Sequence, residues 1–189
     1  GEAIFSCSIS FQKREKGLTH QIKMPNIQGP EKLKSDLELR KDMQSKIPKD
    51  YLPMWLRERE IETRQVEPVD LLKAEKLPPY RSTWMKPTGK LPADERIHQA
   101  LLLYVSDMGL LGAAVNPHEV NFMSKKFQSA SLDHVMWFHG KVNFNNWILH
   151  HMHSPISQNA RGFSRGSIYT KSGKLVASTA QEGLMRIWD

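Results

Sequence analysis

Several side chains in this sequence are of the types that catalyse hydrolysis, and their spacing limits the chemistry they could support. Residues 162–166 match the pattern G-x-S-x-G, which in serine hydrolases presents the nucleophile on a sharp turn between a strand and a helix. Here Ser164 is followed by strand-like residues at 167–170 and by a hairpin turn at 171–173. We therefore interpret Ser164 as a serine within a strand, with a serine esterase as the less favoured alternative.

The histidines raise the question of a metal site. His150, His151 and His153 lie close together in the sequence, and His151 and His153 would share one face of a strand. Two histidines at this spacing can bind zinc. The sequence offers no third ligand of known proximity, so we predict no metal and no cofactor. For His134 and His139 we expect packing and hydrogen bonding to the sheet.

Asp107 stands at the end of the most apolar predicted helix, where the negative end of the helix dipole disfavours a second negative charge. Helix stability therefore does not explain this residue. Taken alone it is best interpreted as a solvated acid beside the turn at Gly109. Ser131 and Gln181 are ordinary strand residues when each is considered by itself.

Hydrophobic periodicity and the positions of Gly and Pro divide the chain into expected elements. The apolar helix begins near Asp94 and carries Ile97, Ala100, Leu101, Tyr104 and Val105 on one stripe that we expect to be buried. A charged helix is expected at 30–47 and a short helical piece at 51–60. Strands are expected at 3–12, 61–67, 81–85, 129–139, 146–153, 161–170 and 175–187.

Two strands, one buried helix and four antiparallel strand segments describe an α+β arrangement in which a sheet wraps around a helix, the hotdog fold. A weak internal echo relates residues 1–11 to residues 173–181. If the echo reflects a repeat, the strand at 3–12 is the last strand of a first hotdog whose remainder is absent from this sequence.

The composition suits one domain or one and a half, with 189 residues, 39% hydrophobic and 25% charged. No apolar run approaches the roughly 20 residues of a membrane helix, so we expect no membrane span. Residues 1–92 carry 18 basic and 13 acidic side chains and residues 93–189 carry 9 and 7, so most of the net charge of +7 lies in the first half. Without a recognition motif, we predict no nucleic-acid partner. The single cysteine, Cys7, indicates a reducing compartment.

Five separated stretches together resemble the acyl-CoA thioesterase II family, over residues from about 60 to the C-terminus and at the opening strand. They are residues 97–107 with Ser106 and Asp107, residues 130–134 with the Asp133-His134 pair, residues 136–139, residues 160–162, and residues 177–183 with a Gln-Glu-Gly motif. The order and spacing of five motifs make the resemblance specific.

The resemblance implies a double hotdog, with two fused repeats and the catalytic residues in the second. It assigns catalysis to an aspartate that ends the central helix, a Thr or Ser two residues before the Asp-His pair, and a glutamine. These become Asp107, Ser131 and Gln181, with a serine where some relatives have threonine. The implied domains are a terminal strand of the first repeat at 1–23, a charged helical linker at 24–57, and the second repeat at 58–189.

The implied activity is hydrolysis of fatty acyl-CoA by an oriented water. A thiol leaving group has a pKa of about 8.5 and departs with little help from an acid. We expect Asp107, buried beside the apolar helix, to accept the proton of the water or to orient it, while Ser131 and Gln181 fix its direction.

Other functions remain open. The chain could be a non-catalytic hotdog used for binding or assembly, and a dehydratase would need a facing His and carboxylate that we cannot place. The expected partners are the substrate and either a second copy of the chain or the missing N-terminal hotdog repeat. The resemblance implies a peroxisomal location, as in eukaryotic members, or otherwise a cytoplasmic one.

Overall fold

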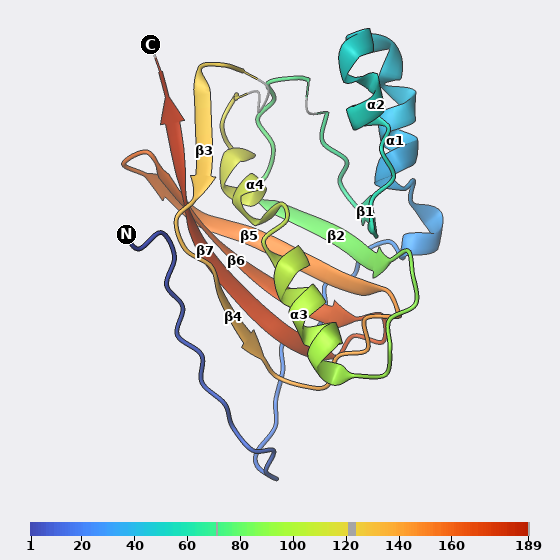
Figure 1. Ribbon diagram of the computed structural model, residues 1–189, viewed down its shortest axis with the longest axis vertical. Helices are drawn as coiled ribbons and strands as arrows, with labels where there is room; N and C mark the ends of the chain where they lie inside the picture. The colour runs from blue at the N-terminus through green and yellow to red at the C-terminus, as the bar shows by residue number, and fades with distance from the viewer. Residues whose placement is uncertain (71, 121–123, 189) are drawn as a thin grey trace.

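The computed structural model describes residues 1–70, 72–120 and 124–188, and shows an antiparallel sheet curled around a helix (Figure 1). The strands are β1 Ile61–Gln65, β2 Tyr80–Pro87, β3 Phe127–Ser131, β4 Val135–Phe138, β5 Ile148–Gln158, β6 Arg161–Thr170 and β7 Leu175–Ile187. The α-helices are α1 Asp36–Asp42, α2 Leu52–Trp55, α3 Glu95–Ser106 and α4 Leu110–Val115. Short 3₁₀ turns occupy Pro30–Lys32, Gln44–Lys46 and Lys49–Tyr51.

The seven strands of the described residues form one sheet in the order β1-β2-β5-β6-β7-β3, and β4 also pairs with β7. Every strand pair is antiparallel. The turn between β6 and β7 has Gly173 at φ +88°, a conformation that glycine adopts without steric cost, as expected for the predicted hairpin. The α+β arrangement predicted from the element order is therefore present.

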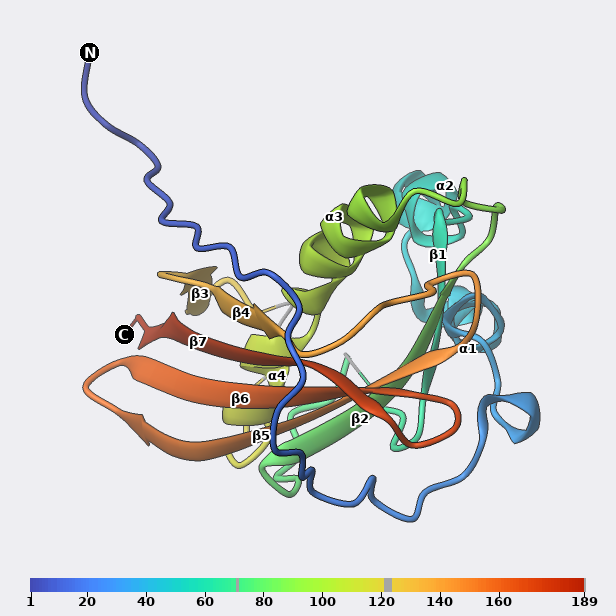
Figure 2. The same ribbon diagram turned by 90° about the horizontal axis from the view of Figure 1, so that it is seen from below.

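Helix α3 lies across the concave face of the sheet (Figures 1 and 2). It begins where Asp94 accepts a hydrogen bond from the backbone N–H of Arg96 at 3.0 Å, as a helix N-cap does. It ends before Gly109, whose φ of +81° breaks the helical path. Helix α4 follows at once, although no helix was predicted between this turn and the strand expected at 129–139.

The buried stripe of α3 differs from the predicted one. His98, Leu102, Val105 and Ser106 face the sheet, whereas Ile97, Ala100 and Tyr104 of the predicted stripe are exposed, Tyr104 by 64%. Of the predicted stripe, only Val105 is fully buried. The helix is apolar on two faces, so periodicity alone could not identify the face that meets the sheet.

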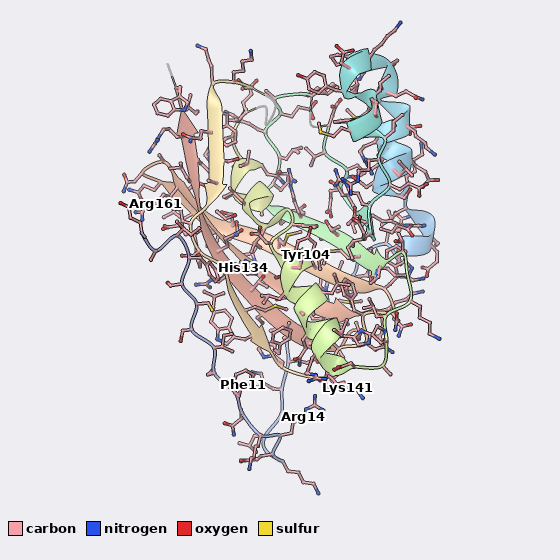
Figure 3. The ribbon with its side chains drawn as sticks, in the orientation of Figure 1. Phe11, Arg14, Tyr104, His134, Lys141 and Arg161 are labelled. Atoms are coloured by element: carbon pink, nitrogen blue, oxygen red, sulfur yellow. The ribbon has the colours of Figure 1, made fainter. Side chains whose placement is uncertain are left out.

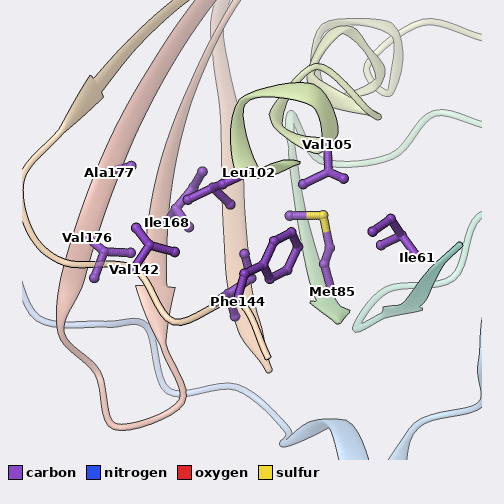
Figure 4. Packing of buried hydrophobic residues seen from close by; sticks show 10 residues of the cluster. Ile61, Met85, Leu102, Val105, Val142, Phe144, Ile168, Val176 and Ala177 are labelled. Carbon is purple, nitrogen blue, oxygen red and sulfur yellow. The ribbon is translucent and has the colours of Figure 1, made fainter. Parts of the chain in front are cut away.

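The main core fills the space between α3 and the sheet (Figure 4). Leu102 and Val105 of α3 are fully buried against it. The other members of this cluster are Ile61, Met85, Val142, Phe144, Ile148, Ile168, Val176 and Ala177. A buried leucine contributes about 1.5–3 kcal/mol relative to its exposed state, so this cluster holds α3 against the sheet.

Helix α4 packs directly on the sheet because two strands present glycines to it. A Cβ added to Gly162 of β6 would lie 2.5 Å from Cβ of Ala114, and one added to Gly183 of β7 would lie 2.6 Å from Leu111. Both distances are far below a normal contact. The glycines therefore let α4 approach the strands closely, which fixes the position of the α3–α4 turn.

The single strand predicted at 129–139 is in fact two strands, β3 and β4, which pair with successive parts of β7. The segment between them leaves the ladder where the Asp133 carboxylate accepts the backbone N–H of Glu182 at 2.8 Å. A side chain thus replaces a backbone partner, which is the usual way that Asp interrupts regular structure. The break lies opposite residues 181 and 182 of β7.

The strand predicted at 3–12 is wrong. Residues 1–20 form no helix or strand and are exposed, and the segment runs free of the sheet in Figure 2. A strand needs a neighbouring strand to accept its backbone hydrogen bonds, and none of the described residues provides one here. The assignment of residues 1–23 to a first repeat stays a prediction.

The predicted linker forms a broken series of short helices rather than one helix over 30–47. Ser35 and Glu38 form a reciprocal capping pair at the start of α1. The Arg40 side chain donates hydrogen bonds to the backbone carbonyls of Trp55 and Arg57 at the end of α2. Met24, Ile27 and Leu33 pack on the outer face of the sheet against Trp84, Leu149 and Tyr169. The linker therefore belongs to the folded unit.

Residues Glu95–Val115, which comprise α3, the break at 107–109 and α4, are long and apolar enough to cross a membrane, with 44% of their most apolar stretch buried. Length and composition alone do not distinguish a membrane-spanning helix from the core helix of a globular protein. The predicted absence of a membrane span is therefore not confirmed.

Candidate active site

Asp107, Ser131 and Gln181 lie together at the C-terminal end of α3. Oδ1 of Asp107 accepts hydrogen bonds from Nε2 of Gln181 and from Oγ of Ser131, the latter at 3.3 Å. Oδ2 accepts no hydrogen bond from any residue that the structure describes. The arrangement therefore leaves one carboxylate oxygen held and the other available to a reactant.

Three elements bring these side chains together. Asp107 is the C-cap of α3, immediately before the turn at Gly109. Ser131 is the last residue of β3, at the point where Asp133 interrupts the sheet, and its register partner on β7 is Gly183. Gln181 faces the helix from the middle of β7. The helix end and the strand break thus determine the geometry of the site.

The burial of the three side chains differs. Gln181 is 1% exposed, whereas the side chain of Asp107 is 52% exposed and Ser131 is also exposed. The expectation that Asp107 is buried beside the apolar helix is therefore wrong, because the helix ends at the surface. A half-exposed carboxylate can meet solvent water and a bound molecule, while the buried amide cannot move far.

His134 and Ser106 form a second layer behind Asp107, near the end of α3 that Figure 3 marks with Tyr104 and His134. Nε2 of His134 lies 2.8 Å from Oγ of Ser106, and Nδ1 lies 3.9 Å from Oδ1 of Asp107. Burial lowers the pKa of His134 below its usual value, against the opposite pull of Asp107 and Asp133. This imidazole is therefore neutral near pH 7.

Polar side chains also line the sheet beneath this end of the helix. Ser164 of β6 is the register partner of Gln181, and His150 of β5 contacts Oγ1 of Thr179 at 3.2 Å. Burial lowers the pKa of His150 to about 3. Oγ of Ser164, Oε1 of Gln181 and Nδ1 of His150 are buried without a hydrogen-bond partner in the part of the chain that the structure describes. This part of the interior is consequently polar and incompletely paired.

The structure also tests the two other hypotheses from the motifs, a serine nucleophile at Ser164 and a metal site at the histidines. Ser164 lies in the middle of β6, fully buried and with strand on both sides, so it is not on a strand–helix turn. His151 bonds to Ser82 across the sheet at 3.0 Å and His153 is exposed. Among the described residues, no three His, Cys, Asp or Glu side chains gather closely enough to hold a metal ion.

The chain belongs to the acyl-CoA thioesterase family, because the model of that family matches residues 55–184. The sequence is 36% identical to acyl-CoA thioesterase 2 of Haemophilus influenzae over 94% of this chain and 62% of the relative. It is 34% identical to a peroxisomal acyl-coenzyme A thioester hydrolase of Saccharomyces cerevisiae over 48% of this chain and 26% of the relative.

Solved structures agree with this assignment. The crystal structure of an acyl-CoA thioesterase II from Mycobacterium marinum matches 94% of this chain and 61% of its own, with 29% identity and a TM-score of 0.68. A protein with a hot dog fold from Alicyclobacillus acidocaldarius matches with a TM-score of 0.63 at 14% identity, which shows the fold alone. The predicted hotdog fold is confirmed. The chain spans about three fifths of the length of the bacterial relatives.

The family resemblance predicts Asp107, Ser131 and Gln181, whereas the expected roles of His134 are packing and hydrogen bonding to the sheet, and the sequence assigns no separate role to Ser106. The adjacent pairs Ser106-Asp107 and Asp133-His134 contained the available signal. The first pair lies where α3 ends, and the second lies in the break between β3 and β4. The sequence did not reveal this break, because the segment at 129–139 was predicted as one strand.

Proposed function

We propose that this chain takes part in the hydrolysis of fatty acyl-CoA to a free fatty acid and coenzyme A. The observation that carries the proposal is the hydrogen-bonded group of Asp107, Ser131 and Gln181 at the exposed end of a helix in a member of this family. The activity is a proposal because the chain covers only part of each bacterial relative.

In the proposed reaction Asp107 acts through Oδ2. With Oδ1 held by Gln181 and Ser131, Oδ2 accepts a proton from a water as the water oxygen bonds to the thioester carbonyl carbon. The C–S bond then breaks and the departing thiolate takes a proton, so one water is consumed for each acid and thiol formed. The thiolate is a good leaving group, so the reaction requires no covalent acyl-enzyme.

Gln181 cannot act as a base, because the nitrogen lone pair of an amide is delocalised into the carbonyl and takes up no proton at ordinary pH. Its contribution is to donate a hydrogen bond to Oδ1 of Asp107, which orients the carboxylate. A general base in a fixed orientation typically accelerates a reaction by about 10²- to 10⁴-fold. Loss of the carboxylate should therefore remove most of the activity.

The test is thiol release from a medium-chain or long-chain acyl-CoA by the parent chain and by Asp107→Asn. We expect the parent to release thiol and the variant to lose about 100-fold or more in kcat. Asp50→Asn, which alters an exposed acid in the linker, is the matched control. Equal rates in Asp107→Asn and the parent would rule out the proposed base.

A second candidate is a non-catalytic hotdog used for binding or assembly. Four apolar side chains are exposed on α3 and in the turn after it: Ile97, Leu103, Tyr104 and Met108. Exposed apolar side chains that lie together are typical of a surface that another protein covers. We propose that a second copy of the chain or an N-terminal hotdog repeat covers it.

The two candidates differ in one measurement. Binding of a non-hydrolysable thioether analogue of acyl-CoA, measured by calorimetry, without any thiol release from acyl-CoA would favour the binding module. Sedimentation of the chain alone tests the self-association, since a monomer at high concentration would point to the separate repeat as the covering partner.

We also propose a peroxisomal location, with the cytoplasm as the alternative. The name of the yeast relative supports the first and the bacterial relative is consistent with the second. Imaging of a fluorescent fusion of the full-length protein beside a peroxisomal marker distinguishes them, because a diffuse signal would reject the peroxisome.

A further inference from the structure

One ring nitrogen of His134 lies close to Asp107 without a hydrogen bond to it. This nitrogen, Nδ1, is buried and has no hydrogen-bond partner among the described residues, yet it lies 3.9 Å from Oδ1 of Asp107. A direct hydrogen bond requires roughly 2.7–3.2 Å. A bridging water would hold the two atoms about 4.5 Å apart. The distance is therefore that of a direct pair that a small movement closes.

Asp107 is the partner that can move. Its side chain is 52% exposed, whereas His134 is 18% exposed and its other nitrogen is fixed by Ser106. Catalytic hydrogen bonds are often long before a substrate binds and shorten when it does. A shift of about 1 Å by the carboxylate would complete the contact without disturbing the sheet.

The direction of the Ser106 hydroxyl is coupled to which nitrogen of His134 carries the proton. Its Oγ lies 2.8 Å from the carbonyl oxygen of Leu103 and 2.8 Å from Nε2 of His134, but the hydroxyl has one hydrogen to donate. If the hydrogen goes to Leu103, Nε2 must donate and Nδ1 presents a lone pair to the carboxylate. If it goes to His134, Nδ1 carries the proton and can donate to Asp107.

The charge on Asp107 favours the second arrangement, because two lone pairs that face each other repel and an N–H that faces a carboxylate attracts. The other ionisable groups near the imidazole are Asp133 beside it in the sequence and His150 on β5. Asp133 also favours a proton on the ring, and His150 is neutral. None of these ionisable groups opposes an N–H directed at Asp107, whereas the carbonyl oxygen of Leu103 does, because the Ser106 hydroxyl then donates to His134 instead of to Leu103.

We propose that His134 is a positioning residue that donates its Nδ1–H to Oδ1 of Asp107, in the tautomer that the charge on Asp107 favours and in which Nε2 accepts from the hydroxyl of Ser106. The proposal rests on the proposed function. Oδ1 then has three donors, from Gln181, Ser131 and His134, and the carboxylate is oriented with Oδ2 toward the reacting water. His134 does not touch the water itself.

Two substitutions separate the nitrogens of the ring. His134→Asn retains an amide nitrogen close to the position of Nδ1, whereas His134→Gln retains one close to Nε2. We expect His134→Gln to lose about 10- to 100-fold in kcat with little change in KM, since one charge-assisted hydrogen bond is lost. His134→Asn should recover most of this loss, which a purely structural role would not predict.

The chain offers a matched control in His139, whose Nε2 lies 2.8 Å from Oγ of Ser178. This His–Ser pair repeats the contact of His134 with Ser106 at the other end of β4, away from Asp107. His139→Gln should therefore leave kcat within about twofold of the parent. Equal losses in His134→Gln and His134→Asn, or a loss in His134→Gln no greater than in His139→Gln, would overturn the proposal.

A second measurement does not depend on hydrolysis. Long-range ¹H–¹⁵N correlation spectra distinguish a protonated ring nitrogen from a bare one, and His134→Gln assigns the signals. We expect the Nδ1–H tautomer in the parent and a shift toward the Nε2–H tautomer in Asp107→Ala. An Nε2–H tautomer in the parent would overturn the proposal even if the chain hydrolyses acyl-CoA. An inactive parent would contradict the proposed function, and the tautomer would still decide the role of His134.

Discussion

The space between α3 and the sheet has an apolar end and a polar end, and both are built from the same helix and the same three strands. Alternate residues of a strand face one side of a sheet, so a strand can present apolar and polar side chains to α3 in succession. The apolar end includes Leu102, Ile148, Ile168 and Ala177, and the polar end includes Ser106, His150, Ser164 and Gln181.

The two ends make opposite contributions to stability. At the apolar end, tightly packed side chains gain free energy from burial. At the polar end, Oγ of Ser164, Oε1 of Gln181 and Nδ1 of both His134 and His150 are buried without a hydrogen-bond partner among the described residues, and an unpaired buried group costs about 1–3 kcal/mol. The difference indicates that the apolar end stabilises the packing of α3 on the sheet. The polar end lowers the free energy of unfolding but holds the polar side chains that surround Asp107.

The largest effect on stability should come from the apolar end. Leu102→Ala removes a fully buried side chain from the core cluster and should lower the free energy of unfolding by about 2–5 kcal/mol, because the cavity left behind does not collapse fully. Urea unfolding followed by circular dichroism measures this loss.

Leu103→Ala is the matched control, since the neighbouring leucine on α3 is 45% exposed. It should cost less than about 1 kcal/mol. Similar losses in the two variants would mean that the face of α3 assigned to the core is wrong.

The polar end should make stability depend on pH. His150 has a pKa of about 3 in the folded protein, because burial disfavours its charged form, against an ordinary value of 6.5. The unfolded chain therefore binds a proton that the folded chain does not, between these two values. This contribution is fully present above pH 6.5 and is lost as the pH falls toward 3, by about 1.4 kcal/mol per pH unit.

His150→Leu should reduce the slope of unfolding free energy against pH by that amount between pH 6 and pH 4. The exposed His153 on the same strand provides the control, and His153→Gln should retain the slope of the parent. Denaturant unfolding at several pH values checks both. An unchanged slope in His150→Leu would show that the imidazole meets water.

The elements that the sequence predicted well are those with strong local signals. The start of α3 follows from Asp94, and the hairpin between β6 and β7 follows from the turn at 171–173. The strands β6 and β7 follow from their β-branched and aromatic residues, whereas β5, expected at 146–153, continues to Gln158. These features depend on the properties of adjacent residues, so a single sequence contains them.

The features that the sequence analysis missed depend on contacts between distant segments. The break between β3 and β4 arises because Asp133 bonds to Glu182, 49 positions later. The buried face of α3 is chosen by the shape of the sheet, and residues 3–12 lack a partner strand among the described residues. The grouping of Asp107, Ser131 and Gln181 came from family resemblance, since each residue alone is ordinary.

The smallest effect is expected at Ser164, and it tests whether the polar end contains a nucleophile. The hydroxyl is fully buried and unpaired, so Ser164→Ala removes a desolvation cost along with a small volume. We expect the free energy of unfolding to change by less than about 1 kcal/mol.

Thiol release should persist in Ser164→Ala if Asp107 activates water, and a fluorophosphonate probe should not label the parent chain. A serine nucleophile predicts the reverse: labelling of the parent, and loss of both labelling and hydrolysis in the variant. The substitution is informative because it leaves the packing of β6 nearly intact. Loss of hydrolysis with normal unfolding could then be attributed to chemistry at Ser164, and the water mechanism at Asp107 would have to be abandoned.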